Sequence, residues 1–226
     1  MERVVRKSAA EVVADQLREA IVFGDLEMGA TLSEAAIAET LGTSRTPVRE
    51  AFRALAQEGL VVLRPYSGAS VFMLSPGEVR DLLEFRAVLE LAALQKAFAT
   101  GAQGLRATLA PLVAGMSEAV ERADIRQYMT LDSQFHRAIV AASGNDHLAD
   151  AHARISPKVA AIRNLINRAP SRLGNSMAGH QAILNGIAAG DLEGTAAILK
   201  QHLHNLTEVV IACLAGAPTL ESEPAT

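Results

Sequence analysis

The sequence predicts a mainly α-helical protein: an N-terminal unit of helices with one small β-hairpin, followed by an all-α helical bundle. Half of the 226 residues are hydrophobic, but only 4% are aromatic and tryptophan is absent, so alanine, leucine, valine and isoleucine supply the apolar mass. Such a mixture favours helices over an aromatic-rich β-sandwich. Apolar residues also recur at helical spacing along almost the whole chain, whereas only two short runs are β-prone.

Composition excludes several other classes of protein. With 16 glycines, 8 prolines and one cysteine, the chain is neither collagen-like, nor of low complexity, nor a disulfide scaffold. The lone Cys213 cannot form an internal disulfide, which favours a reducing compartment. No stretch has the length and apolarity of a membrane span, and the N-terminus lacks the apolar core of a signal peptide. We therefore expect a cytoplasmic protein without a membrane partner.

Overall charge gives no sign of nucleic-acid binding. The formal net charge is −4, and residues 1–75 carry eight lysines or arginines against ten acidic residues. Any DNA-binding surface must therefore depend on where the basic residues sit.

Two helices are expected before residue 42. Ser8-Ala-Ala-Glu11 is a capping box, and the apolar residues after it repeat at helical spacing until Gly24. A loop follows, and a short helix fits Ser33–Thr40.

A third helix and a hairpin complete the N-terminal unit. The helix begins near Ser44 or Thr46, with a proline in its first turn, and runs to Gly59. Two β-prone runs, Leu60–Leu63 and Ala69–Leu74, flank the turn sequence RPYSG and predict a hairpin.

A second capping box, Ser75-Pro-Gly-Glu78, marks the boundary between two domains because a new helix starts there. We expect an N-terminal domain over 1–75, a helical domain over 76–216 and a disordered tail over 217–226. The helices expected after the boundary span 76–100, 105–123, 125–143, 146–168, 176–189 and 192–215.

The order of helix, turn, helix and hairpin is typical of a winged helix-turn-helix, whose second helix enters the DNA major groove. Arg45, Arg49 and Arg53 follow one another at i, i+4 and i+8, so they form one stripe on that helix. The opposite stripe is apolar and is expected to face the core; it consists of Val48, Phe52 and Leu55.

Individual roles follow from position. Ser44 and Thr46, at the helix start, are placed to donate to phosphate, and Arg45 and Arg49 to reach guanine edges. In the hairpin, Arg64 would contact the DNA backbone and Gly68 would allow close approach. Spacing alone fits equally well a solvated arginine-rich face on an ordinary helical domain.

The C-terminal part contains a pattern that suits a metal ion. Asp132 and His136 lie four positions apart in a helical stretch, so both lie on one face. His180 and His202 lie in the last two helices, which a bundle can bring against the first pair. Three imidazoles and one carboxylate suit Zn²⁺, Ni²⁺, Fe²⁺ or Mn²⁺ without choosing among them. By spacing alone, each histidine also fits an ordinary structural role.

The run LSEAAIAETLGTSRTPVREAFRALAQEGLV, residues 32–61, resembles the DNA-binding signature of the GntR family of bacterial transcription regulators. The resemblance implies that Arg45 and Arg49 contact operator DNA, with Thr46 and the wing glycine Gly68 assisting.

The run DSQFHRAIVAASGN, residues 132–145, looks like a segment of the FCD effector domain found in the FadR-type branch of that family. Later landmarks also match, including the segment that starts at His180 and then His202. In metal-binding members, residues at these positions hold a divalent metal in the bundle, which implies a site made of Asp132, His136, His180 and His202.

Arg86 lies in a segment that resembles another part of the FCD pattern, where an arginine points into the effector pocket and pairs with a carboxylate. An ion pair between Arg86 and Glu90 along one helix is the alternative interpretation. Arg163 and Asn167 are further candidates for the pocket. Gly179 departs from the family, which often has glutamate there, so a partner for His180 is expected to be missing. Three other histidines are not assigned to the site: His147, His152 and His204.

Together these features predict a metabolite-responsive regulator, a repressor rather than an enzyme. A homodimer would bind a pseudo-palindromic operator in double-stranded DNA, and a small carboxylate would bind the metal and Arg86. A metal-dependent enzyme is the rival, but the sequence places no general base or nucleophile beside the ligands. A regulator with a closed structural metal, or with the metal itself as signal, stays open.

Overall fold

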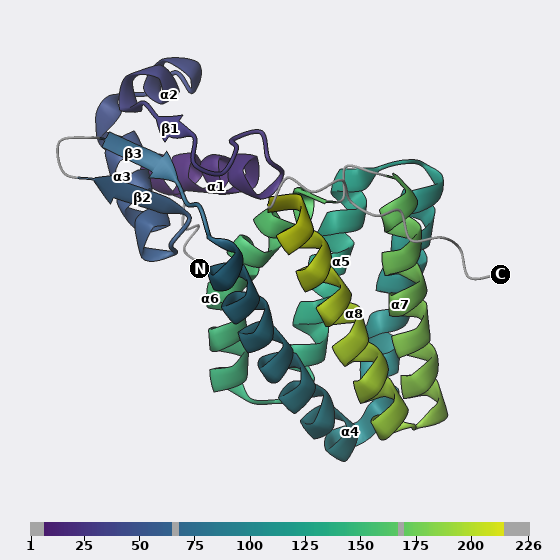
Figure 1. The fold of residues 1–226 in the computed structure, drawn as a ribbon. Coiled ribbons are helices and arrows are strands. Elements are labelled where there is room, and N and C mark those ends of the chain that lie inside the picture. Colours follow the sequence, from purple (N-terminus) through teal and green to yellow (C-terminus); the bar gives the residue numbers. More distant parts are fainter. Residues whose placement is uncertain (1–6, 65–67, 167–169, 215–226) are drawn as a thin grey trace. The chain divides into compact units, whose positions relative to one another are not determined.

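The computed structural model describes residues 7–64, 68–166 and 170–214, and of 170–172 only the backbone (Figure 1). The chain divides into two compact units, Met1–Met73 and Leu74–Thr226. Asn167 and the tail over 217–226, both subjects of predictions, lie outside the described residues. None of the helices in the described ranges is long and apolar enough to span a membrane.

The N-terminal unit consists of three helices and a three-stranded antiparallel sheet. Its elements are α1 (Ala9–Val22), β1 (Thr31–Leu32), α2 (Glu34–Thr40), α3 (Arg45–Gln57), β2 (Val61–Arg64) and β3 (Gly68–Val71). The Ser8 capping box and the Ser33 cap fix the starts of α1 and α2 as the sequence predicts. The β2–β3 hairpin is confirmed, with Val61 opposite Val71 and Arg64 opposite Gly68.

Strand β1 is an element that the sequence did not predict. Its two residues, Thr31 and Leu32, pair with Ser70 and Ala69 and make the sheet order β1-β3-β2. Two residues are too few to show the alternation on which strand prediction depends.

The core of this unit lies between α1 and α3. Leu17 and Ile21 of α1 are buried, as are Val48, Phe52 and Leu55 of α3. A bidentate ion pair joins the same two segments, because Arg18 Nε and Nη2 donate to Glu58 at 2.7 and 2.6 Å. The packing fixes which face of α3 points outward.

The C-terminal unit is entirely helical in the described residues. Its helices are α4 (Pro76–Glu121), α5 (Ile125–Ala141), α6 (Asp146–Asn164), α7 (Pro170–Ala189) and α8 (Leu192–Leu214). Helix α4 packs against the other four, and α8 lies beside α4 and α7 (Figure 1). Their inward faces make a bundle core in which polar groups are also buried.

Two features of the helices differ in detail from the sequence prediction. The break expected at residues 101–104 is a kink within α4, where Gly101 has φ 138° and ψ 99°. Only glycine adopts such a backbone without strain. Helix α7 was expected from residue 176 but begins at Pro170, because proline is tolerated in a first turn where its missing N–H is not needed.

Candidate functional site

One face of α3 in the N-terminal unit is strongly basic. Arg45, Arg49 and Arg53 are all exposed, while the residues of the opposite stripe are almost completely buried. Ser44 is the N-cap, but its side chain makes no capping hydrogen bond, so the hydroxyl is not used to start the helix. This arrangement suits a helix that presents cations and a free hydroxyl to a phosphate backbone.

Arg49 is held by an acidic side chain of the neighbouring helix. Its Nε donates to Glu34 Oε1 at 3.0 Å and its Nη2 to Glu34 Oε2 at 2.7 Å. This fork holds the pKa of Glu34 below its usual value, and Arg45 and Arg53 act in the same direction. Sequence reasoning had not included Glu34 in the surface.

At the start of β3, next to the hairpin turn, the backbone has a conformation that favours glycine. Gly68 has φ +83°, and a Cβ at this position would meet no atom within 4 Å. Its glycine is therefore required by the backbone angle and not by crowding within the protein. Arg64 is exposed directly opposite, and the tip over 65–67 lies outside the described residues.

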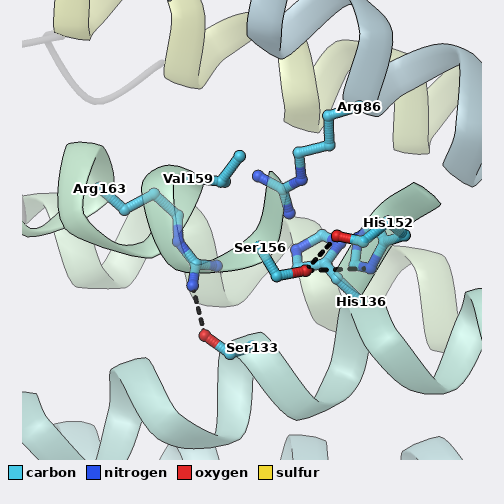
Figure 2. A pocket seen from close by; sticks show the side chains of 7 residues that line it. All are labelled: Arg86, Ser133, His136, His152, Ser156, Val159 and Arg163. Atoms are coloured by element: carbon cyan, nitrogen blue, oxygen red, sulfur yellow. Dashed lines mark hydrogen bonds between the residues drawn. The ribbon is translucent and has the colours of Figure 1, made fainter. Parts of the chain in front are cut away.

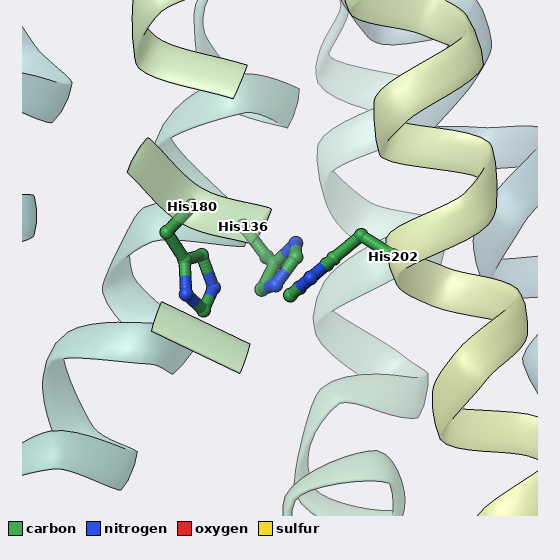
Figure 3. A group of neighbouring side chains, drawn as sticks. All are labelled: His136, His180 and His202. Carbon is green, nitrogen blue, oxygen red and sulfur yellow. The ribbon is translucent and has the colours of Figure 1, made fainter. Parts of the chain in front are cut away.

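In the C-terminal unit, three histidines from three helices converge (Figure 3). His136 of α5, His180 of α7 and His202 of α8 each offer one ring nitrogen, and these atoms lie within 4.8 Å of one another. Asp132, one turn before His136, places Oδ1 3.3 Å from His180 Nε2 and Oδ2 3.9 Å from His136 Nε2. The fold thus brings together the four residues that the sequence singled out.

Glu90, on α4, contacts the outer ring nitrogen of His136 and so orients that ring in the cluster. It is fully buried, and its Oε2 lies 2.7 Å from His136 Nδ1, while Oε1 lies 2.6 Å from Arg86 Nε and 3.3 Å from His152 Nε2. Burial alone would raise the pKa of Glu90, but Arg86 and the two histidines hold it well below its usual value. An ionised Glu90 requires a proton on His136 Nδ1. The lone pair of the ring is then on Nε2, which faces the cluster.

The electrostatics of the cluster suit metal binding. Burial lowers the pKa of His136 and of His180 to about 3, and lowers that of His202 well below 6.5. All three rings are therefore neutral near pH 7, which is the form that coordinates metals. Among the described residues, His180 Nε2 and Arg163 Nε are buried without a hydrogen-bond partner, and Asp132 Oδ2 makes no hydrogen bond but contacts Arg163 Nη1. A buried ring nitrogen without a partner, next to a carboxylate, fits a divalent ion with nitrogen and oxygen ligands.

A small cavity of about 20 Å³ adjoins the cluster (Figure 2). It is lined by Arg86, Ser133, His136, His152, Ser156, Val159 and Arg163. None of these side chains is acidic, and two carry guanidinium groups. Each guanidinium has a buried carboxylate behind it, Glu90 for Arg86 and Asp132 for Arg163.

The two arginines of the cavity are both anchored. Arg86 is paired with Glu90, as the alternative interpretation had it, and it also lines the cavity. Arg163 Nη2 donates to Ser133 Oγ at 2.6 Å, and Nη1 contacts Asp132 Oδ2. Burial lowers the pKa of Arg163 to about 9, so the group is still charged at pH 7.

The sequence does not assign His152 to the site, yet this side chain lines the cavity and reaches Glu90. Glu90 itself is predicted only as an alternative partner of Arg86, and the structure adds its contacts with His136 and His152. Glu90 lies on the same helical stripe as the buried Ala93, Leu94 and Ala97, a pattern that indicates burial. By contrast, His147 and His204 are exposed, away from the cluster.

Gly179 has a different consequence from the one expected. A Cβ at this position would lie 2.5 Å from His202 Nδ1, so the glycine makes room for that ring. His180 has neighbours for its other nitrogen: the ring hydrogen-bonds to the backbone of Ser176, and Tyr128 Oη lies 3.5 Å from Nδ1.

Comparisons with known proteins agree in both units. Residues 9–71 match the model for bacterial regulatory proteins of the gntR family, and residues 81–205 match the FCD domain. An HTH-type transcriptional regulator of Streptomyces ambofaciens, itself uncharacterized, is 30% identical over 91% of this chain and 86% of its own length. A protein of Paenarthrobacter nicotinovorans, described as a probable D-xylose utilization operon transcriptional repressor, is 31% identical over 89% of this chain and 88% of its own.

A solved structure extends the similarity to the fold. The transcriptional regulator GntR from Rhodococcus sp. RHA1 superimposes with a TM-score of 0.79 at 25% identity, covering 91% of this chain and 99% of that one.

Proposed function

The chain belongs to the GntR family of bacterial regulatory proteins and carries an FCD domain, and on this premise we propose that it is a repressor whose helical domain senses a small carboxylate through a bound divalent metal. The family and the relatives are DNA-binding transcriptional regulators, not enzymes, and some relatives are described as repressors. We assign residues 1–75 to DNA binding and 76–216 to sensing. A regulator of chromosomal genes would act in the cytoplasm.

The DNA contacts that we propose come from α3 and the wing. Arg45 and Arg49 would read base edges in the major groove, and the remaining residues would contact the backbone; the surface consists of Ser44, Arg45, Thr46, Arg49, Arg53, Arg64 and Gly68. Two copies of the chain would bind the two halves of a pseudo-palindromic operator, one recognition helix in each.

The observation that carries the sensing function is the convergence of His136, His180 and His202 beside a cavity lined by two arginines. With Asp132 they would hold a divalent metal, which when bound supplies a Lewis-acidic position for a carboxylate oxygen. Glu90 keeps Arg86 in place through Nε, so the terminal edge of that guanidinium remains for the acid. Arg163 adds a second positive charge to the same space.

A carboxylate can change operator affinity only if it binds one conformation of the dimer better than the other. The experiment that tests the proposal measures both properties in one sample. Metal-loaded protein is used to select duplexes from a randomised DNA pool, and the affinity for the selected duplex is then measured with a panel of small mono-, di- and hydroxycarboxylates.

We expect at least one acid to shift the affinity, and Arg86→Lys to abolish the shift while leaving DNA binding intact. Lysine keeps a positive charge next to Glu90 but lacks the second donor edge. No effect of any acid on metal-loaded protein, or an unchanged effect in Arg86→Lys, would contradict the sensing function.

A further inference from the structure

Glu34 is an acidic residue that contacts the basic surface of α3. It is the first residue of α2, and its carboxylate receives two hydrogen bonds from Arg49 of α3. A carboxylate at this place opposes the attraction of Arg45, Arg49 and Arg53 for phosphate. Its presence therefore calls for a physical reason other than affinity for DNA.

Fold stability does not supply that reason. The pair is solvent-accessible, with 57% of the Arg49 side chain and 32% of the Glu34 side chain exposed, and such pairs contribute little to stability. Helix α2 is started by the side chain of Ser33, and α3 is tied to the rest of the unit by its buried apolar stripe and by the pair between Arg18 and Glu58.

The geometry of the pair leaves one edge of Arg49 available. Glu34 occupies the side of the guanidinium formed by Nε and Nη2. The remaining two-donor edge, formed by Nη1 and the second N–H of Nη2, can still donate to the O6 and N7 acceptors of guanine. A free arginine would lose many rotamers on binding a base, and an arginine already held loses fewer.

We propose that Glu34 is a specificity-determining residue that positions Arg49 for guanine and suppresses its attraction to phosphate elsewhere. The inference rests on the proposed function, in that it takes Arg49 to read a base. Both effects of Glu34 act in one direction. The two hydrogen bonds from Arg49 to Glu34 hold the arginine in a position that favours guanine, a base with two acceptors. The negative charge of Glu34 weakens binding to DNA that lacks a guanine at this position.

The test compares five proteins, namely the wild type, Arg49→Lys and three variants of acidic residues. Each is used in selection from a randomised DNA pool, followed by affinity measurements on the selected duplex and on a scrambled one over a range of salt. Glu34→Gln removes the charge and the strong fork. Glu34→Asp keeps the charge but shortens the side chain, which breaks the two-bond geometry. Glu39→Gln, at an exposed position of the same helix, changes the net charge equally without touching Arg49.

In Glu34→Gln we expect the preference for one base pair in each half-site to fall about tenfold, the order expected for part of a bidentate contact. Scrambled DNA should bind more tightly, with a salt slope steeper by about 0.9, the increment for one additional phosphate neutralised. Glu34→Asp should lose the base preference without the gain in non-specific binding. Glu39→Gln should keep the preference.

The outcomes separate the inference from the function on which it rests. If the wild type selects no sequence, operator binding itself fails. If Arg49→Lys leaves the selected sequence unchanged, Arg49 is not a base reader and the inference fails with it. If Arg49→Lys alters one base pair and both Glu34 variants keep it, the proposed role of Glu34 is wrong while operator binding stands.

Discussion

Replacing Glu90 with glutamine is expected to weaken both the fold of the helical domain and its metal site. Glu90 is completely buried and accepts from Arg86 at 2.6 Å, from His136 at 2.7 Å and from His152 at 3.3 Å. Glutamine fills the same volume, but it leaves the buried Arg86 without its counter-charge and offers an amide donor where an acceptor is needed.

The magnitude follows from the loss of one partner of a buried ion pair, which costs about 3–5 kcal/mol. For a chain of this size, 1 kcal/mol corresponds to roughly 2–4 °C in Tm, so the metal-free variant should melt about 6–20 °C lower than the wild type. Metal affinity should also fall, by about 10- to 100-fold, because the proton on His136 Nδ1 is no longer fixed by a carboxylate.

The assay is thermal unfolding followed by circular dichroism, with and without chelator, together with calorimetric titration of Zn²⁺ into metal-free protein. Glu84→Gln is the matched control, since Glu84 is exposed on the same helix. A Tm within about 2 °C of the wild type, combined with unchanged Zn²⁺ affinity, would refute the role given to Glu90.

Three further predictions concern other residues and the metal. Chelation of metal-loaded protein should lower its Tm, because a ligand at 100 times its Kd stabilises the folded state by about 2.7 kcal/mol. An unchanged Tm in a calorimetric scan would contradict a bound metal. Gly179→Ala should raise helix propensity but push the His202 ring aside. We therefore expect the Zn²⁺ affinity, measured by titration, to drop at least about tenfold. An unaltered affinity would show that His202 does not ligate in this position. Gly68→Ala should destabilise the N-terminal unit by about 1–3 kcal/mol, measured by urea unfolding, because φ +83° is strained for alanine; a neutral result would show that the wing relaxes.

Features with a local signal could be read from the sequence. The starts of α1 and α4 follow from capping boxes, and the outward stripe of α3 follows from the spacing of its arginines, because both depend on residues within two turns. The pairing of Asp132 with His136 is of the same kind. The short β1 gave no such signal.

Features that depend on packing between distant segments could not be read in this way. Nothing near His152 indicates that it meets Glu90, 62 residues away, and the fork between Glu34 and Arg49 joins residues 15 apart on different helices. The contact between Gly179 and the ring of His202 depends in the same way on how α7 and α8 pack. His180 and His202 were joined to the site by a resemblance to a known domain, and the bundle geometry now gives the physical reason for that grouping.

The most direct test of the sensing function is native mass spectrometry of the full chain purified without chelator. We expect a species near twice 23.8 kDa with about one divalent metal for each chain, and loss of that metal in His180→Gln but not in His204→Gln, whose side chain is exposed. A metal-free monomer from the wild type would contradict both the metal site and the dimeric mode of operator binding.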